Sequence, residues 1–259
     1  MSTQDQWDTG TFSQSPIISQ LQNQTQYFQS FQQWPQLSDY QALFKQFAMK
    51  IRPVAQASEI SCFEEQYEPR VFLKQELQTR TENWHDFFNA MVWLKFPHSK
   101  QALNQRHYEA ASQRATGTNR STLENRLTQF DECGAIIVAS SEKPLQLIRN
   151  HQWQTLFIEQ ASLFKQDIRC IVFGHAIFEK ALAPYIGMTC HCLMLADPAL
   201  LAELEDGRNE GLDRTIADYW LRQPTDGLDR LQPLPLLGIP GYWPQQDSAF
   251  YANEKYFRK

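Results

Sequence analysis

Side chains that suit acid–base or binding chemistry lie within a highly aromatic stretch that begins at Asn83. The segment reads Asn83-Trp-His-Asp-Phe-Phe-Asn-Ala-Met-Val-Trp-Leu-Lys-Phe-Pro, with His85 and Asn89 four residues apart. On a helix this spacing places the two side chains next to each other. Polar groups among aromatic rings cost free energy unless they are hydrogen-bonded or used. We therefore predict that His85 and Asn89 face a pocket.

A second polar stripe follows Pro97. Lys100, Asn104 and His107 are spaced i, i+4 and i+7, so a helix presents them on one face. Together with His85 they could bind a phosphate, move protons or hold a divalent metal. The structural alternative is a core histidine bonded to a backbone carbonyl, beside a helix that turns its polar face to water. Because the chain has no His-Glu-x-x-His spacing, the metal signal is weak.

Three further groups of residues could carry chemistry. His175 follows the apolar segment Ile168–Phe173, so we expect it at the carboxyl end of a strand, suited to an oxyanion or phosphate rather than a metal. Asp131 and Glu132 could be metal ligands or a general base, as could Asp86. If all strands were parallel, the Asp131–Glu132 pair would lie at the opposite edge of the sheet from His175. A joint site therefore requires the first strand to run antiparallel, or a non-adjacent arrangement.

The motif Cys190-His191-Cys192 resembles a metal cluster only superficially. On a strand the two cysteines point to one face and His191 to the other. No Cys-x-x-Cys pair is present to complete a zinc site, and there is no phosphate-binding loop or dinucleotide motif. We interpret this segment as a buried strand and predict no nucleotide cofactor.

The elements that position these residues follow from hydrophobic periodicity. Residues 37–51 show helical spacing that ends at Pro53, and residues 60–80 are strand-like around Phe63 and Val71–Leu73. Asn83 is typical of a helix N-cap, with Asp86 at the third helical position. Pro97 should end that helix, and Ser99 could cap the next.

Strand-like and helical segments alternate after Gly134. The predicted strands are 134–140, 168–173 and 189–196, and the predicted helices are 144–165, 176–183 and 199–223. This alternation favours parallel strands with right-handed crossovers. We predict an α/β (or α+β) fold, a small mostly parallel or mixed sheet flanked by helices. The Pro/Gly-rich tail from Pro233 should lack regular structure and pack on the core.

Length and composition fit one globular domain with an N-terminal extension. The chain has 259 residues, a net charge of −5 and a pI near 5.7, so duplex DNA is not an expected partner. It has no apolar run of membrane-spanning length, no basic secretory leader, and five cysteines without repeating spacing, which together indicate the cytoplasm. Residues 1–36 are Gln-rich and should form a flexible arm, which could bind a protein partner. Residues 37–259 should form the domain.

Taken together, these motifs resemble a family of uncharacterised bacterial proteins, domain of unknown function 3025. The matching pieces include the segment from Asn83, the Lys100/Asn104/His107 face, Asp131-Glu132-x-Gly134, Phe173-Gly-His-Ala176 and the tail Pro235-Leu-Leu-Gly-Ile-Pro-Gly-Tyr-Trp. They cover roughly residues 40–259. The resemblance supports a single domain and implies no activity.

The function that the residues favour is a hydrolase or transferase that acts on a phosphate-bearing small molecule or nucleotide. Lys100 and His107 would hold the anion, Asn89 and Asn104 would help to bind it, and His85 or His175 would act as acid or base. The alternative is a non-catalytic module that binds a ligand or RNA, and a third reading makes the aromatic motif purely structural.

Overall fold

A computed structural model describes residues 6–114, 119–224 and 231–258. Its strands are β1 (Arg52–Val54), β2 (Glu76–Gln78), β3 (Gly134–Ala139), β4 (Ile168–Val172), β5 (Thr189–Ala196) and β6 (Gln232–Pro235). Its α-helices are α1 (Thr11–Gln14), α2 (Gln22–Thr25), α3 (Leu37–Gln46), α4 (Tyr67–Lys74), α5 (Trp84–Lys95), α6 (Pro97–Gln113), α7 (Thr122–Cys133), α8 (Glu142–Arg149), α9 (Ala161–Asp167), α10 (His175–Lys180), α11 (Pro198–Glu205), α12 (Glu210–Arg222) and α13 (Ser248–Tyr251).

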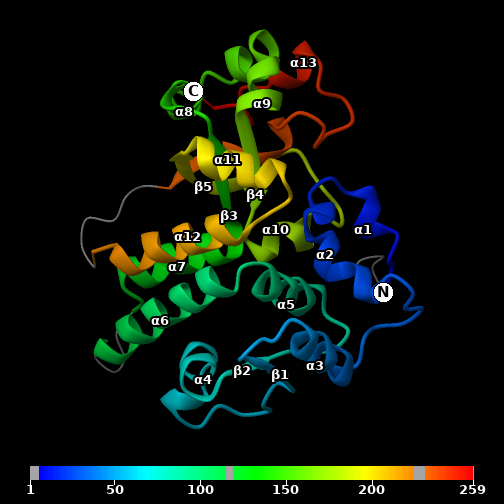
Figure 1. The fold of residues 1–259 in the computed structure, drawn as a ribbon, viewed down its shortest axis with the longest axis vertical. Coiled ribbons are helices and arrows are strands. Elements are labelled where there is room, and N and C mark those ends of the chain that lie inside the picture. Colours follow the sequence, from blue (N-terminus) through cyan, green and yellow to red (C-terminus); the bar gives the residue numbers. More distant parts are fainter. Residues whose placement is uncertain (1–5, 115–118, 225–230, 259) are drawn as a thin grey trace.

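The larger sheet lies in the upper half of the molecule, below α8, α9 and α13, and the short β1–β2 pair lies near the opposite end, with α5, α6, α7, α10 and α12 between the two sheets (Figure 1). The larger sheet has the order β4-β3-β5-β6. All residues of its inner strand β3 are buried, because helices cover the sheet. The fold is therefore α/β with a mixed sheet flanked by helices, as predicted. No helix among the described residues is long and apolar enough to cross a membrane.

Strand direction differs from the prediction at β4. Strands β3 and β5 are parallel, as the alternation of segments predicted, but β4 and β6 run antiparallel to their neighbours. The interpretation of Ile168–Phe173 as a parallel strand is therefore wrong. Along β4 buried and half-buried residues alternate, as expected for an edge strand that is covered mainly on one face. The antiparallel direction places the end of β4 beside the start of β3.

The segment from residue 60 to 80 is mainly helical, which corrects the prediction of strand there. Val71 lies in α4, flanked by the short parallel strands β1 and β2. Pro69 is compatible with a helix because it lies in the first turn, where its missing N–H needs no partner. Val71 and Pro69 are the buried residues of α4.

Helix α6 begins at Pro97 itself, so Ser99 is not its N-cap. Instead, the Ser99 hydroxyl donates to Asp213 of α12 at 2.5 Å, and the backbone N–H groups of His98 and Ser99 donate to the same carboxylate. Helix α5 does begin as predicted, because Asn83 Oδ1 accepts a hydrogen bond from the backbone N–H of Asp86 at 2.9 Å.

The Gln-rich segment, expected to be a flexible arm, packs against α5 instead. Trp7 stacks on Trp84 with ring centroids 5.0 Å apart, and Phe12 stacks on Phe87 at 5.7 Å. Ile18, Leu21 and Phe28 are fully buried. The scattered aromatic residues of this segment therefore have partners in the core, which offset the entropy lost on ordering.

The C-terminal tail packs on the core as predicted, although part of it is regular. Residues 232–235 form the edge strand β6, which pairs with β5. Beyond it the Tyr256 hydroxyl donates to the Met188 carbonyl at 2.7 Å and accepts from the Leu237 N–H at 2.8 Å. Pro233 and Pro235 are tolerated because an edge strand has one side free of ladder hydrogen bonds.

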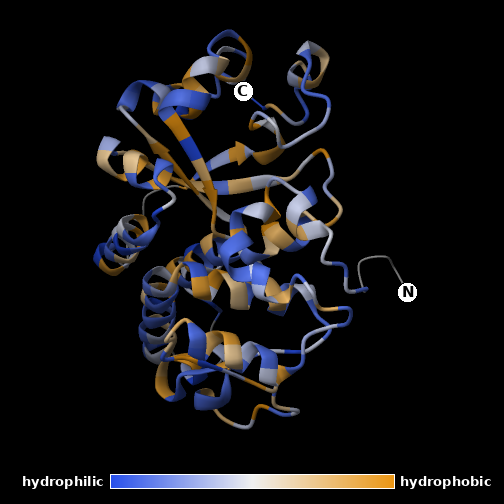
Figure 2. Cartoon of the chain, turned by 45° about the vertical axis from the view of Figure 1, so that its right-hand side comes forward, coloured by the Kyte–Doolittle hydropathy of each residue, from blue (hydrophilic) through white to orange (hydrophobic). Residues whose placement is uncertain are grey.

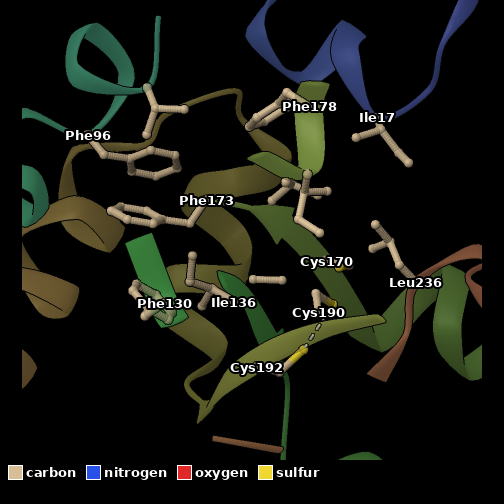
Figure 3. Packing of buried hydrophobic residues seen from close by; sticks show 14 of the residues in the cluster. Ile17, Phe96, Phe130, Ile136, Cys170, Phe173, Phe178, Cys190, Cys192 and Leu236 are labelled. Atoms are coloured by element: carbon tan, nitrogen blue, oxygen red, sulfur yellow. Dashed lines mark hydrogen bonds between the residues drawn. The ribbon is translucent and has the colours of Figure 1, made fainter. Parts of the chain in front are cut away.

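Aromatic residues join the helical layer to the sheet. Phe96 and Phe130 contact Phe173 with ring centroids 5.1 and 4.7 Å from it (Figure 3). Figure 2 shows that hydrophobic residues concentrate on the strands and on the inward sides of the helices. Phe173 directly precedes Gly174 and His175, so this packing fixes the backbone that carries His175.

Candidate functional site

A pocket of about 420 Å³ opens between α4, α5, α6, α7 and α10. We call it the polar pocket. The histidines that line it are His85, His107 and His175, and the carboxylates include Glu68, Asp86, Asp131 and Glu132. Arg80, Arg114 and Arg120 also line it. The pocket therefore collects many of the ionisable residues that the sequence singled out, on five different helices or their flanking loops.

The histidine–carboxylate cluster, which we define as His85, Glu132 and His175, lies in one wall of this pocket. The two Nε2 atoms of His85 and His175 are 3.0 Å apart. The Glu132 carboxylate is 3.7 Å from His175 Nε2 and 4.0 Å from His85 Nε2. One potential ligand atom from each side chain lies within 4.8 Å of the other two, so these three residue types could hold a metal ion.

The other ring nitrogen of each histidine also faces a carboxylate. His85 Nδ1 is 2.8 Å from Glu179 Oε2, and His175 Nδ1 is 3.7 Å from Asp131 Oδ2. The Glu179 hydrogen bond raises the pKa of His85. Burial lowers the pKa of His175 to about 3, because its side chain is only 5% exposed. The pKa values of the two neighbouring imidazoles are therefore shifted in opposite directions.

The local fold explains why these side chains meet. His85 lies in the first turn of α5, Glu132 in the last turn of α7, and His175 is the first residue of α10. Gly174 makes the approach possible: a Cβ there would lie 2.4 Å from the Glu132 carbonyl oxygen and 2.5 Å from the Gly134 nitrogen. Gly174 N–H donates to the Gly134 carbonyl at 2.8 Å. Backbone contact at this glycine thus brings Glu132 and His175 together.

A buried lysine holds Asp131, the carboxylate that lies beside His175. Lys100 is 3% exposed, and its ammonium donates to Asn89 Oδ1 at 2.9 Å and to Asp131 Oδ1 at 2.6 Å. It also lies 5.4 Å from the centre of the Trp93 ring. Burial acts to raise the pKa of Asp131, but the charge and hydrogen bond of Lys100, together with the neighbouring histidines His175 and His107, outweigh it and the pKa is lowered. Asp131 is therefore held as a carboxylate between Lys100 and His175.

Glu68 of α4 and His107 of α6 also line the polar pocket and face each other. Asn104 Nδ2 donates to Glu68 Oε2 at 2.6 Å, and Glu68 Oε1 lies 4.0 Å from His107 Nε2. Burial raises the pKa of Glu68 to about 7, and the Asp131 charge adds to the increase. Burial lowers the pKa of His107 to about 4, so this imidazole is neutral at pH 7.

Most of the predicted site residues line the polar pocket, but Lys100 and Asn104 do not. Those two lie beside a separate cavity of about 10 Å³, which His107 also borders. Asn89 lines the polar pocket and donates to the Tyr67 hydroxyl at 2.8 Å. Of the stripe formed by Lys100, Asn104 and His107, only His107 therefore also reaches the polar pocket.

Asp86 lines the polar pocket, yet its carboxylate is engaged by one neighbour. It accepts hydrogen bonds from the Arg80 backbone N–H at 2.7 Å and from two guanidinium nitrogens at 2.9 and 3.0 Å. This bidentate pair uses both carboxylate oxygens. It leaves Asp86 less suited to acid–base chemistry than Glu132, whose side chain is 37% exposed.

Sequence analysis missed Glu68 and Glu179. Glu179 follows His175 by four residues, and this helical spacing is a signal that could have identified it as a partner on the same helix. Glu68 gave no such signal, because it lies in the segment that was predicted to be strand. The motif Cys190-His191-Cys192 lies on β5 as predicted, with Cys190 and Cys192 buried and His191 hydrogen-bonded to Gln129.

Comparison with known families gives one match. The family described as "Protein of unknown function (DUF3025)" matches residues 51–259. No curated protein and no solved structure matches the chain. The match covers every residue of the histidine–carboxylate cluster, together with Glu68, Lys100 and His107, and begins after the Gln-rich segment.

Proposed function

Because the chain belongs to the DUF3025 family, whose description names no activity, we propose a function from its own pocket: hydrolysis of a small phosphate-bearing molecule, such as a nucleotide or a phosphate ester. The single observation that carries this proposal is the presence, in one pocket, of the histidine–carboxylate cluster and of Glu68. Active sites combine ionisable groups whose environments push their pKa values apart, and such groups then serve as acid and base.

One cation in the lining of the polar pocket is available to an anionic substrate. Arg80 and Arg114 are paired with Asp86 and Glu124 at 2.9 and 2.8 Å. Arg120 also lines the pocket, and among the described residues it has no carboxylate within ion-pair distance. A guanidinium that is free of carboxylates can bind phosphate oxygens through two parallel hydrogen bonds. Arg120 is therefore the group assigned to the substrate phosphate.

Glu68 is assigned the proton transfer. Its pKa of about 7 leaves a large protonated fraction at neutral pH, and Asn104 orients its carboxyl group. A water molecule gives one proton to the histidine–carboxylate cluster as its oxygen attacks phosphorus, the ester P–O bond breaks, and the leaving oxygen takes the proton of Glu68. With an alcohol in place of water, the same groups would transfer the phosphoryl group.

The test is a screen of the purified chain against p-nitrophenyl phosphate, bis(p-nitrophenyl) phosphate and nucleoside phosphates. Glu68→Gln should lower kcat/KM by about 10²–10³-fold, within the range of general acid catalysis. Glu142→Gln is the matched control, because Glu142 lies on α8 with its side chain 60% exposed and outside the polar pocket. Equal rates for the two variants would contradict the role of Glu68.

The pH profile gives a second readout. The pKa of Glu68 depends on burial, on Asp131, Lys100 and Arg120, and on its hydrogen bond from Asn104. As an acid Glu68 must be protonated, so kcat/KM should fall as the pH rises through about 7, and the Gln variant should lose this limb. Nucleotide binding without turnover of any probe would favour the alternative, a ligand-binding module, and overturn the hydrolase.

A further inference from the structure

The contact between His85 and His175 needs a positive charge to be stable. With Nδ1–H of His85 directed at Glu179, and Nδ1–H of His175 at Asp131, both Nε2 atoms carry lone pairs, and these face each other at 3.0 Å. If His175 instead carried its proton on Nε2, its bare Nδ1 would face the Asp131 carboxylate. A cation between the two Nε2 atoms, either a proton or a metal ion, removes the repulsion between the lone pairs and leaves the Nδ1 proton facing Asp131.

We infer that this cation is a divalent transition metal, with zinc as the best fit, and that His85, Glu132 and His175 are its ligands. Two histidines and one glutamate are a donor set of catalytic zinc sites. Zinc–nitrogen bonds of about 2.0–2.1 Å place two imidazole nitrogens of a tetrahedral site roughly 3.3 Å apart. The observed 3.0 Å is close to that value.

The third ligand is near enough to complete the set. Glu132 oxygens lie 3.7 and 4.0 Å from the two Nε2 atoms, so a shift of a few tenths of an ångström brings one into a tetrahedral arrangement. The Glu132 side chain is 37% exposed and has no hydrogen-bond partner that would oppose this shift among the described residues. The remaining coordination position faces the polar pocket, as in catalytic rather than structural zinc sites.

The surroundings of the two imidazoles also match a metal site. Metal-bound histidines usually direct their second ring nitrogen at a carboxylate or carbonyl, which fixes the tautomer and increases ligand basicity. Here Glu179 serves His85, and Asp131, itself anchored by Lys100, serves His175. Buried His175 Nδ1 makes no hydrogen bond among the described residues, so its 3.7 Å contact with Asp131 can shorten when a metal binds.

The experiment measures metal binding directly and so is independent of turnover. The chain is stripped with a chelator and titrated with Zn²⁺ by calorimetry, and with Co²⁺ by its visible absorption. We expect one Zn²⁺ per chain and an intense cobalt spectrum of low coordination number. Glu132→Gln and His175→Ala should each weaken Zn²⁺ binding at least about 10–100-fold, as should Glu179→Gln through His85.

His191→Ala is the matched control, because His191 is a half-buried histidine outside the cluster and should bind Zn²⁺ like the wild type. If His175→Ala does not fold, the Zn²⁺ affinity of the conservative variant Glu132→Gln still tests the site. The site would be overturned if Glu132→Gln bound Zn²⁺ as tightly as the wild type, or if the wild type bound no Zn²⁺. The cation between the imidazoles would then be a shared proton. The inference concerns the pocket of the proposed function. Zn²⁺ binding without hydrolysis would contradict only that function, and hydrolysis by a chain that binds no Zn²⁺ would contradict only this site.

Discussion

Single residues in the polar pocket differ in role from what their type suggests. Lys100 was expected to hold an anion, but its ammonium is buried and bonded to Asn89 and Asp131. Its effect on a ligand is therefore indirect, through the charge and position of Asp131. A buried ion pair of this kind contributes little net stability compared with apolar residues, yet breaking it leaves an uncompensated charge.

Lys100→Met should destabilise the fold by about 3–5 kcal/mol, because it leaves the Asp131 carboxylate buried without its cation. Urea denaturation measures the loss. The double variant Lys100→Met/Asp131→Asn should recover much of it, since the orphaned charge is removed as well. Equal stability of Lys100→Met and the wild type would mean that the pair is hydrated and that Lys100 is free to act on a ligand.

Much of the histidine–carboxylate cluster could be predicted residue by residue. His85 and His175 were identified by their position among apolar residues, and Glu132 by its place beside Asp131 before a strand. Their convergence could not be predicted, because it depends on long-range pairing rather than on local spacing. Glu68 was missed because its neighbours Val71 and Leu73 suggested a strand, whereas tertiary packing makes that segment helical.

At the scale of elements, the direction of β4 decides whether the site exists. An apolar run of five or six residues fits a parallel or an antiparallel strand equally well, so hydrophobic pattern alone cannot choose between them. With β4 antiparallel to β3, residues after Val172 meet residues before Gly134. The sequence analysis stated that a joint site for His175 and Asp131–Glu132 required an antiparallel strand or a non-adjacent arrangement, but the alternation of helices and strands favoured parallel strands.

Gly174 lies where α10 packs against the end of α7, and replacing it should move His175 away from Glu132. In Gly174→Ala the new Cβ meets backbone atoms of residues 132–134 at 2.4–2.6 Å, and backbone cannot rotate away as a side chain can. We expect a loss of about 1–3 kcal/mol or more in unfolding free energy, as for overpacked cores, and weaker Zn²⁺ binding. Gly10→Ala is the control, because its Cβ meets flexible side chains. A stable Gly174→Ala with full Zn²⁺ affinity would contradict this placement.

On the scale of the whole molecule, the Gln-rich segment completes the core. Composition predicted a flexible arm, because few charges and many glutamines are typical of mobile tracts. Composition does not reveal that Trp7, Phe12 and Phe28 each find an aromatic partner on α5. The family match begins at residue 51, so this chain covers the outer side of α5 with a segment that lies outside the matched region.

Gln20 is the residue that ties this segment to three distant parts of the chain. Its side-chain Oε1 accepts from the Val172 N–H at 2.9 Å, and its Nε2 donates to the Cys170 carbonyl at 3.2 Å and to the Tyr242 hydroxyl at 2.5 Å. Its own carbonyl accepts from the Lys95 ammonium at 2.7 Å. The carboxamide thus satisfies the open edge of β4, which would otherwise present unpaired backbone groups.

Replacing Gln20 with Ala should therefore destabilise the protein by about 1–3 kcal/mol, the cost of leaving a buried backbone donor without an acceptor. The local consequence is more specific than the global one: the Val172 amide should exchange its hydrogen faster, while amides of β3 and β5 keep their protection. Gln22→Ala, at an exposed position two residues away, is the control and should leave both stability and exchange unchanged. If the Val172 amide is equally protected in Gln20→Ala, the segment does not seal the β4 edge, and its packing on α5 alone holds it in place.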